Sequence, residues 1–575
     1  MKKKSVRIIL SSIFTLIFAA VSFYVTLPAI NLQNQGFWMF LFYCIAIFLA
    51  IYAALTGFNS IKNDILVKSK NKKGHVTSVK IKKGRGLVIS LCVLFLPIVI
   101  LIIGSIVSST FFHANAYANL IEVPEADFSD DMPENDVVNN IALMDTDTAI
   151  KMGNRTLGAL SNVVSQYEIS DSYRQINYNK APQKISTLEY ADFFKWLSNQ
   201  SSGIPGYVMV DPVNVTDAKY IELEKSIKYT DSGYFNDDLM RKLRFSYPTK
   251  IFSNCSFEID DNGNPYYIVA CMKPRIAMFG AYDVNEVIIF DPVTGDSDIY
   301  PLSEVPSWVD NVFTGTLASQ KYDWYGTLKN GFWNSIIGNK DCKVTTDDYG
   351  YIVIGDDVWF FTGVTSVVSD ESNIGFIISN ARTGEYKFYR VTGAEEYSAM
   401  SSAQGEVQHM GYVASFPSLI NVSGEPTYIM VLKDSAGLVK LYALVNVENF
   451  GIVATGNTQT EAKEEYLKLL KQNGVIDTPS EDNEQQIQST AEATIEIADI
   501  KVYTVGGESI FYITATDGQI YKQRLCDDER LIVLKKDDKI NVKYKVSGEG
   551  STLVREITFF SLIIDETTKQ PARTE

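Results

Sequence analysis

Three long apolar segments near the N-terminus constrain this chain more than any other feature. They run from Arg7 to Ile30, from Phe37 to Gly57 and from Leu87 to Phe112, and no charged side chain interrupts their interiors. A helix needs about 20 mainly apolar residues to cross the ~30 Å hydrocarbon core of a bilayer. Residues 1–112 are therefore predicted to form an anchor of three transmembrane helices.

The positions of Lys and Arg predict the orientation of this anchor, because short loops rich in positive charge stay in the cytoplasm. Basic residues precede the first apolar segment, and the connection 58–86 carries many more against the single acid Asp64. The connection 31–36 has no charged residue. We expect a multi-pass protein of the cell membrane, with the N-terminus and the 58–86 loop in the cytoplasm and the chain after Phe112 extracytoplasmic.

The part of the chain predicted to lie outside is strongly acidic. The whole chain has 52 Lys and Arg and 68 Asp and Glu. Of these, 13 basic residues and one acid precede residue 112, which leaves 39 basic and 67 acidic residues beyond it. A net charge of about −28 opposes contact with nucleic acid or anionic lipid headgroups. We therefore expect a protein partner and no nucleic acid, with the bilayer contacted through the three helices.

Composition divides the rest of the chain into four segments. An acidic, proline-bearing stretch predicts a stalk over 113–136, and alternating helical and β-rich patterns predict an α+β ectodomain over 137–475. Polar residues rich in Glu and Gln predict a linker over 476–493. Short, evenly spaced β-rich runs, with Asp517-Gly518 as a hairpin signal, predict a small β-barrel of OB or SH3 type over 494–565.

An internal repeat is the most informative pattern in the ectodomain. The form G-x-P-x-Y-[IV] begins at Gly203, Gly263 and Gly424, each time before an apolar strand. Residues 263–295 and 424–456 also match without gaps at several other positions, including a Thr-Gly pair at the end of each. The Gly supplies a turn and the Pro begins a strand where its missing N–H does no harm. These units are predicted to be repeated hairpins that bury Tyr267 and Tyr428 on equivalent faces.

A helix followed by a hairpin sheet with an [DN]-x-x-T-G turn, here Asp291 to Gly295, resembles the PepSY-type module of bacterial envelope proteins. The resemblance covers roughly residues 187–456. It implies a non-catalytic module that binds or restrains exported peptidases or cell-wall hydrolases, sometimes from a membrane anchor. The resemblance assigns no catalytic residue to this chain, because the module has none.

Catalytic and cofactor motifs are largely missing from the sequence. Of three His residues, only His409 lies well inside the ectodomain, which excludes a cluster of His metal ligands and leaves one candidate base for a Ser-His-Asp triad. No G-x-S-x-G, P-loop or G-x-G-x-x-G pattern occurs. We therefore expect no enzyme, no catalytic, cofactor-binding or metal-binding residues and no cofactor, with His409 as a surface or packed residue.

One constellation supports an enzymatic alternative. Asp145 and Asp147 follow the apolar run from Ile141, and Asp356 and Asp357 follow another from Tyr351, in the order of the motifs of haloacid-dehalogenase-type phosphatases. Paired acids of this kind could hold Mg²⁺ beside a phosphoryl group. The same residues also fit a helix N-terminus and an ordinary turn. An exported Mg²⁺-dependent phosphatase therefore remains an alternative.

Two cysteines pose a separate question. A hairpin with a loop of Asn262-Gly263-Asn264 would pair Ile259 with Tyr267 and bring Cys255 opposite Cys271, close enough for a disulfide. The second repeat has apolar residues at the equivalent positions, so the pair could also be a plain apolar contact. A shift of register would separate the two thiols.

Together these patterns predict a membrane-anchored, non-enzymatic extracytoplasmic protein that binds or regulates another cell-envelope protein, such as a peptidase or cell-wall hydrolase. The alternatives are the exported phosphatase and a structural subunit of a membrane complex. The sequence does not name the partner, the process or the oligomeric state.

The predicted orientation has a direct test. Protease added to intact cells or protoplasts should degrade the chain after Phe112 and spare the loop 58–86, because only the former is predicted to face outward. Immunoblotting with antibodies against each region would measure this. If the chain after Phe112 were protected from the protease, the predicted orientation would be contradicted.

Overall fold

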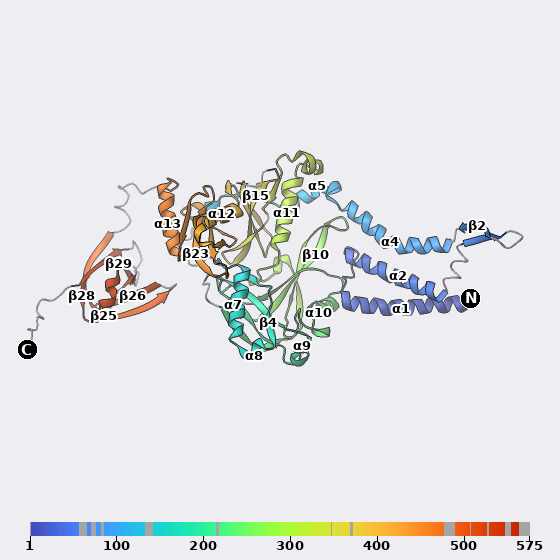
Figure 1. Cartoon of the computed structure of the whole chain (residues 1–575), viewed down its shortest axis with the longest axis horizontal. Coiled ribbons are helices and arrows are strands. Elements are labelled where there is room, and N and C mark those ends of the chain that lie inside the picture. The colour runs from blue at the N-terminus through green and yellow to red at the C-terminus, as the bar shows by residue number, and fades with distance from the viewer. Residues whose placement is uncertain are drawn as a thin grey trace, which may run out of the picture. The chain divides into compact units, whose positions relative to one another are not determined.

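The computed structural model describes most of the chain, namely residues 2–56, 66–70, 76–81, 85–132, 142–213, 218–346, 348–368, 372–476, 489–505, 508–525, 528–546 and 554–562. These residues form a mixed α+β protein with long N-terminal helices and several antiparallel sheets (Figure 1). The chain divides into two compact units, Met1–Tyr466 and Leu467–Glu575.

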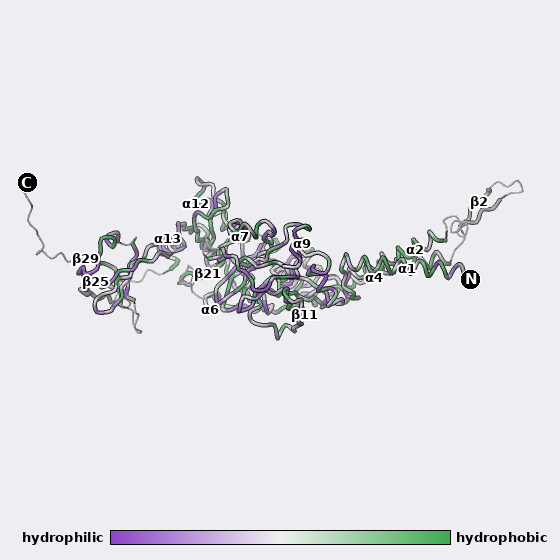
Figure 2. The backbone as a smooth tube through the Cα atoms, turned by 90° about the horizontal axis from the view of Figure 1, so that it is seen from below, coloured by the Kyte–Doolittle hydropathy of each residue, from purple (hydrophilic) through white to green (hydrophobic). Residues whose placement is uncertain are grey.

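Three N-terminal helices are long and apolar enough to cross a membrane, as predicted. They are α1 (Lys2–Thr26), α2 (Gln35–Thr56) and α4 (Arg85–Val107), which form the most uniformly hydrophobic part of the chain (Figure 2). The strands β1 (Leu66–Lys70) and β2 (Val76–Ile81) pair within the basic connection. The third span ends at Val107, earlier than the predicted Phe112, and a separate helix, α5 (Thr110–Ala118), follows it.

The first unit contains four large sheets, each with a helix before its first antiparallel pair. The first sheet follows α7 (Thr146–Gly158) and α8 (Ser161–Val164); it consists of β4 (Tyr167–Ile169), β5 (Arg174–Tyr178), β6 (Ala181–Tyr190), β7 (Ile204–Val210) and β8 (Ala218–Ile227), with α9 (Phe193–Asn199) between β6 and β7. The second follows η2 (Phe235–Asp237) and α10 (Leu239–Ser246); it consists of β9 (Ile251–Ile259), β10 (Pro265–Ile276), β11 (Gly280–Phe290) and β12 (Ser297–Pro301).

The remaining two sheets repeat this order of elements. After η3 (Leu302–Glu304), the third sheet follows α11 (Gly315–Leu328) and η4 (Asn334–Gly338); it consists of β13 (Lys343–Thr345), β14 (Gly350–Ile354), β15 (Asp357–Ser366), β17 (Gly375–Asn380) and β18 (Tyr386–Tyr389), while β16 (Ser372–Asn373) pairs with β19 (Gly393–Ala394). The fourth follows α12 (Glu396–Glu406) and η5 (Gln408–Met410); it consists of β20 (Val413–Ala414), β21 (Ser418–Val422), β22 (Glu425–Lys433), β23 (Val439–Asn446) and β24 (Val453–Gly456), with α13 (Gln459–Gln472) after it.

The four sheets share cores in pairs. The first and second sheets bury one hydrophobic cluster, in which the ring of Tyr207 lies 5.8 Å from Phe257 and that of Tyr267 lies 5.6 Å from Phe257. The third and fourth sheets bury another, in which the rings of Phe376 and Tyr428 lie 5.9 Å apart. Tyr267 and Tyr428 are thus both buried between paired sheets, as the sequence pattern predicted.

The residue-by-residue match between 263–295 and 424–456 does not extend through these strands. Tyr267 pairs with Phe290, whereas Tyr428 pairs with Val445, because the β10–β11 hairpin is longer than the β22–β23 hairpin. The first Thr-Gly pair lies in the turn after Asp291, and the second lies within β24. The shared motif therefore marks the start of β10 and β22 but not the later positions.

The possible disulfide between Cys255 and Cys271 is not formed. The connection between β9 and β10 is 260–264, so Ile259 pairs with Pro265, and Cys255 pairs with Val269. Cys271 pairs with Phe252 beyond a β-bulge. Both thiols are free, and the longer loop with its bulge is the reason the predicted register is wrong.

The acidic stretch predicted as a stalk is instead part of the fold over its described residues. Strand β3 (Glu125–Ala126) pairs with β18 in parallel, and α6 (Phe128–Asp131) follows it. Phe128 is buried with its ring 5.8 Å from that of Tyr389. One aromatic side chain within an acidic segment thus attaches it to the third sheet. Residues 133–136 lie outside the described residues.

The second unit contains one sheet of five strands: β25 (Ser489–Val505), β26 (Glu508–Ala515), β27 (Ile520–Arg524), β28 (Lys539–Val546) and β29 (Val554–Leu562), with η6 (Glu529–Val533) after β27. The strands pair in the order β25-β26-β27-β29-β28, and β28 pairs in turn with β25. The β27–β29 pair is parallel and the other pairs are antiparallel. Buried side chains such as Ile513, Tyr521 and Phe560 fill the interior. Most of the predicted linker, residues 477–488, and Cys526 lie outside the described residues.

The large domain rests directly on the ends of the membrane helices. Arg244 of α10 is buried, and its Nε donates to the carbonyl of Leu27 at 2.9 Å. Its Nη1 donates to the carbonyl of Lys250 at 2.6 Å, and its guanidinium lies 4.3 Å from the centre of the Phe252 ring. The large domain and the α1–α2 connection therefore lie at the same end of the helices (Figure 1).

Replacing Arg244 should loosen this junction. Arg244→Ala removes a charged donor from buried carbonyls and should lower the free energy of unfolding by about 2–3 kcal/mol. Unfolding of the full-length protein in detergent, followed by fluorescence, would measure the change. Lys225→Ala, which truncates an exposed side chain of β8, is the control, and equal effects of the two variants would contradict the role of Arg244.

Candidate functional site

A groove in the first unit lies between the first and fourth sheets, along helix α7. Its volume is about 1120 Å³. Helix α7 and the residues after it supply one wall, the start of β8 a second, and the β22–β23 turn with β23 a third. The lining residues are Thr148, Lys151, Met152, Arg155, Thr156, Ala159, Leu160, Ala218, Lys219, Tyr220, Gly437, Leu438, Val439, Lys440, Tyr442 and Asn457.

Helix α7 is held in place from both sides. At its N-terminus, the side chain of Asp145 accepts a hydrogen bond from the Thr148 N–H at 2.9 Å and forms an ion pair with Lys433 at the end of β22. Further along, Lys151 Nζ donates to the Ala436 carbonyl at 3.3 Å, and Thr156 Oγ1 donates to the Ala218 carbonyl at 3.3 Å. The helix thus connects two sheets that are far apart in the sequence.

The Asp145–Lys433 ion pair also determines the charge state of Asp145. Burial by itself would raise the pKa of Asp145, but the hydrogen bonds from Lys433 and Thr148 and the charge of Lys433 outweigh burial, so the pKa lies below its usual value. Asp145 therefore stays ionised at neutral pH and caps the helix as an anion, which also suits the positive end of the helix dipole.

The charge of the groove is opposite to that of the domain around it. Its charged lining residues are Lys151, Arg155, Lys219 and Lys440, all exposed, and no acidic residue lines it. Only Lys440 has an ion-pair partner among the described residues, Asp434 at 3.3 Å. Apolar side chains also line the groove, including Leu438, which is 57% exposed. A basic, apolar groove in an acidic domain can attract an acidic segment and bury its apolar side chains.

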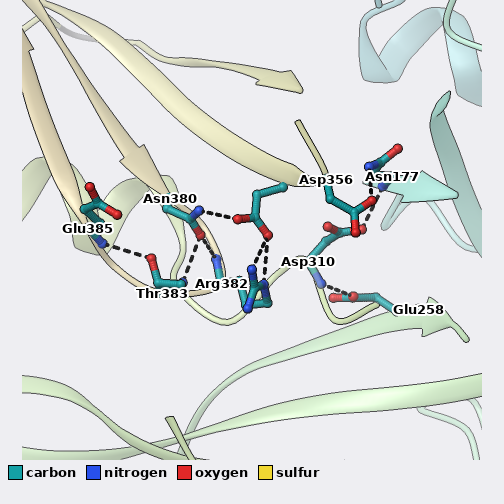
Figure 3. Close-up of polar contacts among 9 residues, drawn as sticks. Asn177, Glu258, Asp310, Asp356, Asn380, Arg382, Thr383 and Glu385 are labelled. Carbon is teal, nitrogen blue, oxygen red and sulfur yellow. Dashed lines mark hydrogen bonds and ion pairs between the residues drawn. The ribbon is translucent and has the colours of Figure 1, made fainter. Parts of the chain in front are cut away.

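The four carboxylates of the phosphatase alternative have separate surroundings. Asp145 caps α7, and Asp147 is exposed in its first turn. Asp356 accepts from Asn177 Nδ2 at 3.0 Å, while Asp357 binds Arg382 at 2.6 Å (Figure 3). Among the described residues, no group of three or more His, Cys, Asp or Glu is placed to hold a metal ion. His409 is exposed on η5.

A buried acidic junction, which the sequence analysis did not predict, joins the first three sheets. Glu258 of β9 is fully buried and accepts hydrogen bonds from the N–H groups of Asp310 and Asn311 at 2.8 and 3.0 Å. Asp310 is 1% exposed and accepts from the Asn177 N–H at 2.7 Å. Asp356 approaches from the turn before β15 (Figure 3). No ion-pair partner of Glu258 or Asp310 occurs in the described part of the chain.

Burial raises the pKa of both carboxyl groups, Glu258 to about 7, and their mutual repulsion raises the pKa of Asp310 further. A carboxyl whose pKa is higher in the folded state binds more protons there than in the unfolded chain. The folded state is therefore destabilised as pH rises above the ordinary carboxyl pKa of about 4 and through the raised values. The only sequence signal was Glu258 itself, an acid within an apolar strand.

Asp310→Asn should remove much of this pH dependence, because the amide keeps an acceptor for Asn177 without a titrating group. At pH 8 the variant should exceed the wild type in stability by at least about 1.4 kcal/mol, the equivalent of a tenfold change in proton affinity, and the difference should shrink as pH falls to about 4 and below. Chemical unfolding of the full-length protein across this range would measure it. The matched control is Asp261→Asn, at an exposed position outside the junction; parallel pH profiles for wild type and Asp310→Asn would contradict the role of the junction.

Comparison with known proteins was made for the whole chain. No model of a known protein family matches it, and no curated protein matches it. The function is therefore inferred from the geometry and charge of the chain itself.

Proposed function

We propose that this protein is a membrane-anchored, non-enzymatic extracytoplasmic binding protein whose groove along α7 receives an acidic, partly apolar segment of another cell-envelope protein. The observation that carries this proposal is the charge of the groove. Four basic residues and no acidic residue line it, although the chain beyond residue 111 has 39 basic and 67 acidic residues. Placement of the large domain outside the cytoplasm is part of the proposal and follows from the basic connection 58–86.

The walls of the groove are suited to binding a segment of another protein rather than to catalysis. Its walls come from a helix and two sheets fixed by the Asp145–Lys433 pair and by side-chain bonds to backbone carbonyls. A preorganised site of this kind loses little conformational entropy when it binds a segment. The basic lining residues would accelerate the encounter with an acidic partner and orient the bound segment, while the apolar lining residues would supply affinity.

The order of elements fits this proposal. Each of the four large sheets follows a helix, which is the plan expected of PepSY-like units that bind or restrain exported peptidases or cell-wall hydrolases. In the second unit, the ring of pairings with one parallel pair supports an OB-like barrel. Such a barrel would be a second binding module.

The groove can be tested by charge reversal. The triple variant Lys151→Glu, Arg155→Glu and Lys219→Glu should weaken binding of a fluorescent peptide of alternating Glu and Leu at least tenfold, because each exposed ion pair contributes up to about 1 kcal/mol. The full-length protein in nanodiscs and fluorescence anisotropy would give the affinity. The same peptide with Lys in place of Glu should bind the wild type weakly and the triple variant better.

The matched control is Lys225→Glu, which reverses an exposed charge on the same strand as Lys219 but outside the groove. It should leave the affinity for the acidic peptide unchanged. A photo-reactive amino acid at Leu438 would then identify the natural partner in cells. Equal affinities of wild type and triple variant for the acidic peptide would contradict the proposal.

A further inference from the structure

An apolar patch at the end of the third membrane helix has no role in the groove. Its members are Phe111, Phe112, Trp333, Ile336 and Ile337, which are 48, 58, 64, 60 and 75% exposed. They come from α5 and from η4 with the residue before it, segments far apart in the sequence. The ring of Phe111 lies 6.0 Å from that of Trp333, so the two segments form one surface. We call these five residues the interfacial patch.

The position of the patch relative to the span is fixed. Helix α4 ends at Val107, and α5 begins at Thr110. Ser108 is held between them, because its carbonyl accepts from Tyr117 Oη at 2.7 Å and its Oγ accepts from the Phe279 N–H at 3.0 Å. Since each residue spans at most about 3.6 Å, Phe111 and Phe112 lie within roughly 15–18 Å of the end of the hydrocarbon-spanning helix. The patch therefore lies close to the end of α4.

The loop that carries Trp333 is built to present its apolar side chains outward. Asn334 Nδ2 donates to the Lys340 carbonyl at 2.9 Å, and Asn334 Oδ1 accepts from the Lys340 N–H at 3.2 Å. Asn330 Nδ2 also donates to the Lys340 carbonyl, at 3.1 Å. These amide hydrogen bonds connect the two ends of the loop, and Trp333, Ile336 and Ile337 between them are exposed. Exposing three large apolar groups to water is unfavourable and marks a contact surface.

We propose that the interfacial patch is inserted in the extracytoplasmic leaflet of the membrane, where it holds the large domain against the lipid surface. Continuity with the α4 span identifies lipid as the occupant, because the span itself lies in the bilayer. Trp and Phe side chains are those enriched at the interface between hydrocarbon and headgroups. Together with Arg244 at the α1 end, the patch gives the domain a second point of support. This inference is independent of the proposed groove.

Fluorescence quenching in nanodiscs tests the insertion of Trp333. The full-length protein would carry Trp38→Phe, since Trp38 lies within the α2 span, and would be compared with the same protein that also carries Trp333→Phe. Lipids brominated near the glycerol end of the acyl chain should quench the first protein and lose most of that effect in the second. Equal quenching of the two would overturn the proposal.

Spin labelling provides a readout that does not depend on tryptophan. A nitroxide at Ile337→Cys should be more accessible to oxygen, which dissolves in lipid, than to a water-soluble nickel chelate. The matched control is Leu438→Cys, an exposed apolar position in the groove, and it should show the opposite order. A label at Ile337 that prefers the nickel chelate, or that is shielded from both reagents by a bound protein, would overturn the proposal.

Discussion

The attachment of the large domain to the ends of the membrane helices is the constraint on which the rest of the first unit depends. Spanning helices satisfy their own backbone hydrogen bonds, but the residues just beyond them need other partners. Here Arg244 binds the carbonyl of Leu27, and the Ile30 N–H donates to the Pro248 carbonyl at 2.8 Å. Ser108 does the same at the end of α4 by binding residues of the second sheet. The second sheet is therefore fixed to the ends of α1 and α4.

Aromatic side chains pack the four sheets of the first unit against one another in pairs. Tyr207, Phe257 and Tyr267 join the first sheet to the second, and Phe376 with Tyr428 joins the third to the fourth. Buried polar contacts join the pairs, since Asp310 binds the backbone of Asn177 and Asn177 binds Asp356. A rigid assembly of this kind can hold the walls of a groove at fixed positions, which is the condition for a preorganised binding surface.

The charged side chains of the first unit have distinct structural roles. The Asp145–Lys433 pair fixes α7. Lys151, Arg155 and Lys219 give the groove its positive charge, and the buried Glu258 and Asp310 make the junction sensitive to pH. The junction ties three sheets together, so its protonation and the rigidity of the domain are physically linked.

The sequence by itself determined the features that depend on local composition. Runs of apolar residues fixed the three spans, because a bilayer requires length and hydrophobicity and little else. The Gly-x-Pro-x-Tyr pattern correctly marked the starts of β10 and β22 and the burial of Tyr267 and Tyr428, since turn and strand preferences are local. Segment boundaries were less exact, as Phe128 shows by attaching the predicted stalk to the third sheet.

Only the tertiary structure decided which distant residues meet. A bulge and a longer loop moved Cys271 opposite Phe252, because register depends on loop length that no single residue encodes. From sequence, Asp145 fits either a nucleophile or a helix cap; in the structure it accepts from the Thr148 N–H and pairs with Lys433 of the fourth sheet. The basic groove and the interfacial patch likewise combine segments separated by hundreds of residues. Charge and hydrophobicity can be read from the sequence, but their gathering on one surface depends on long-range packing.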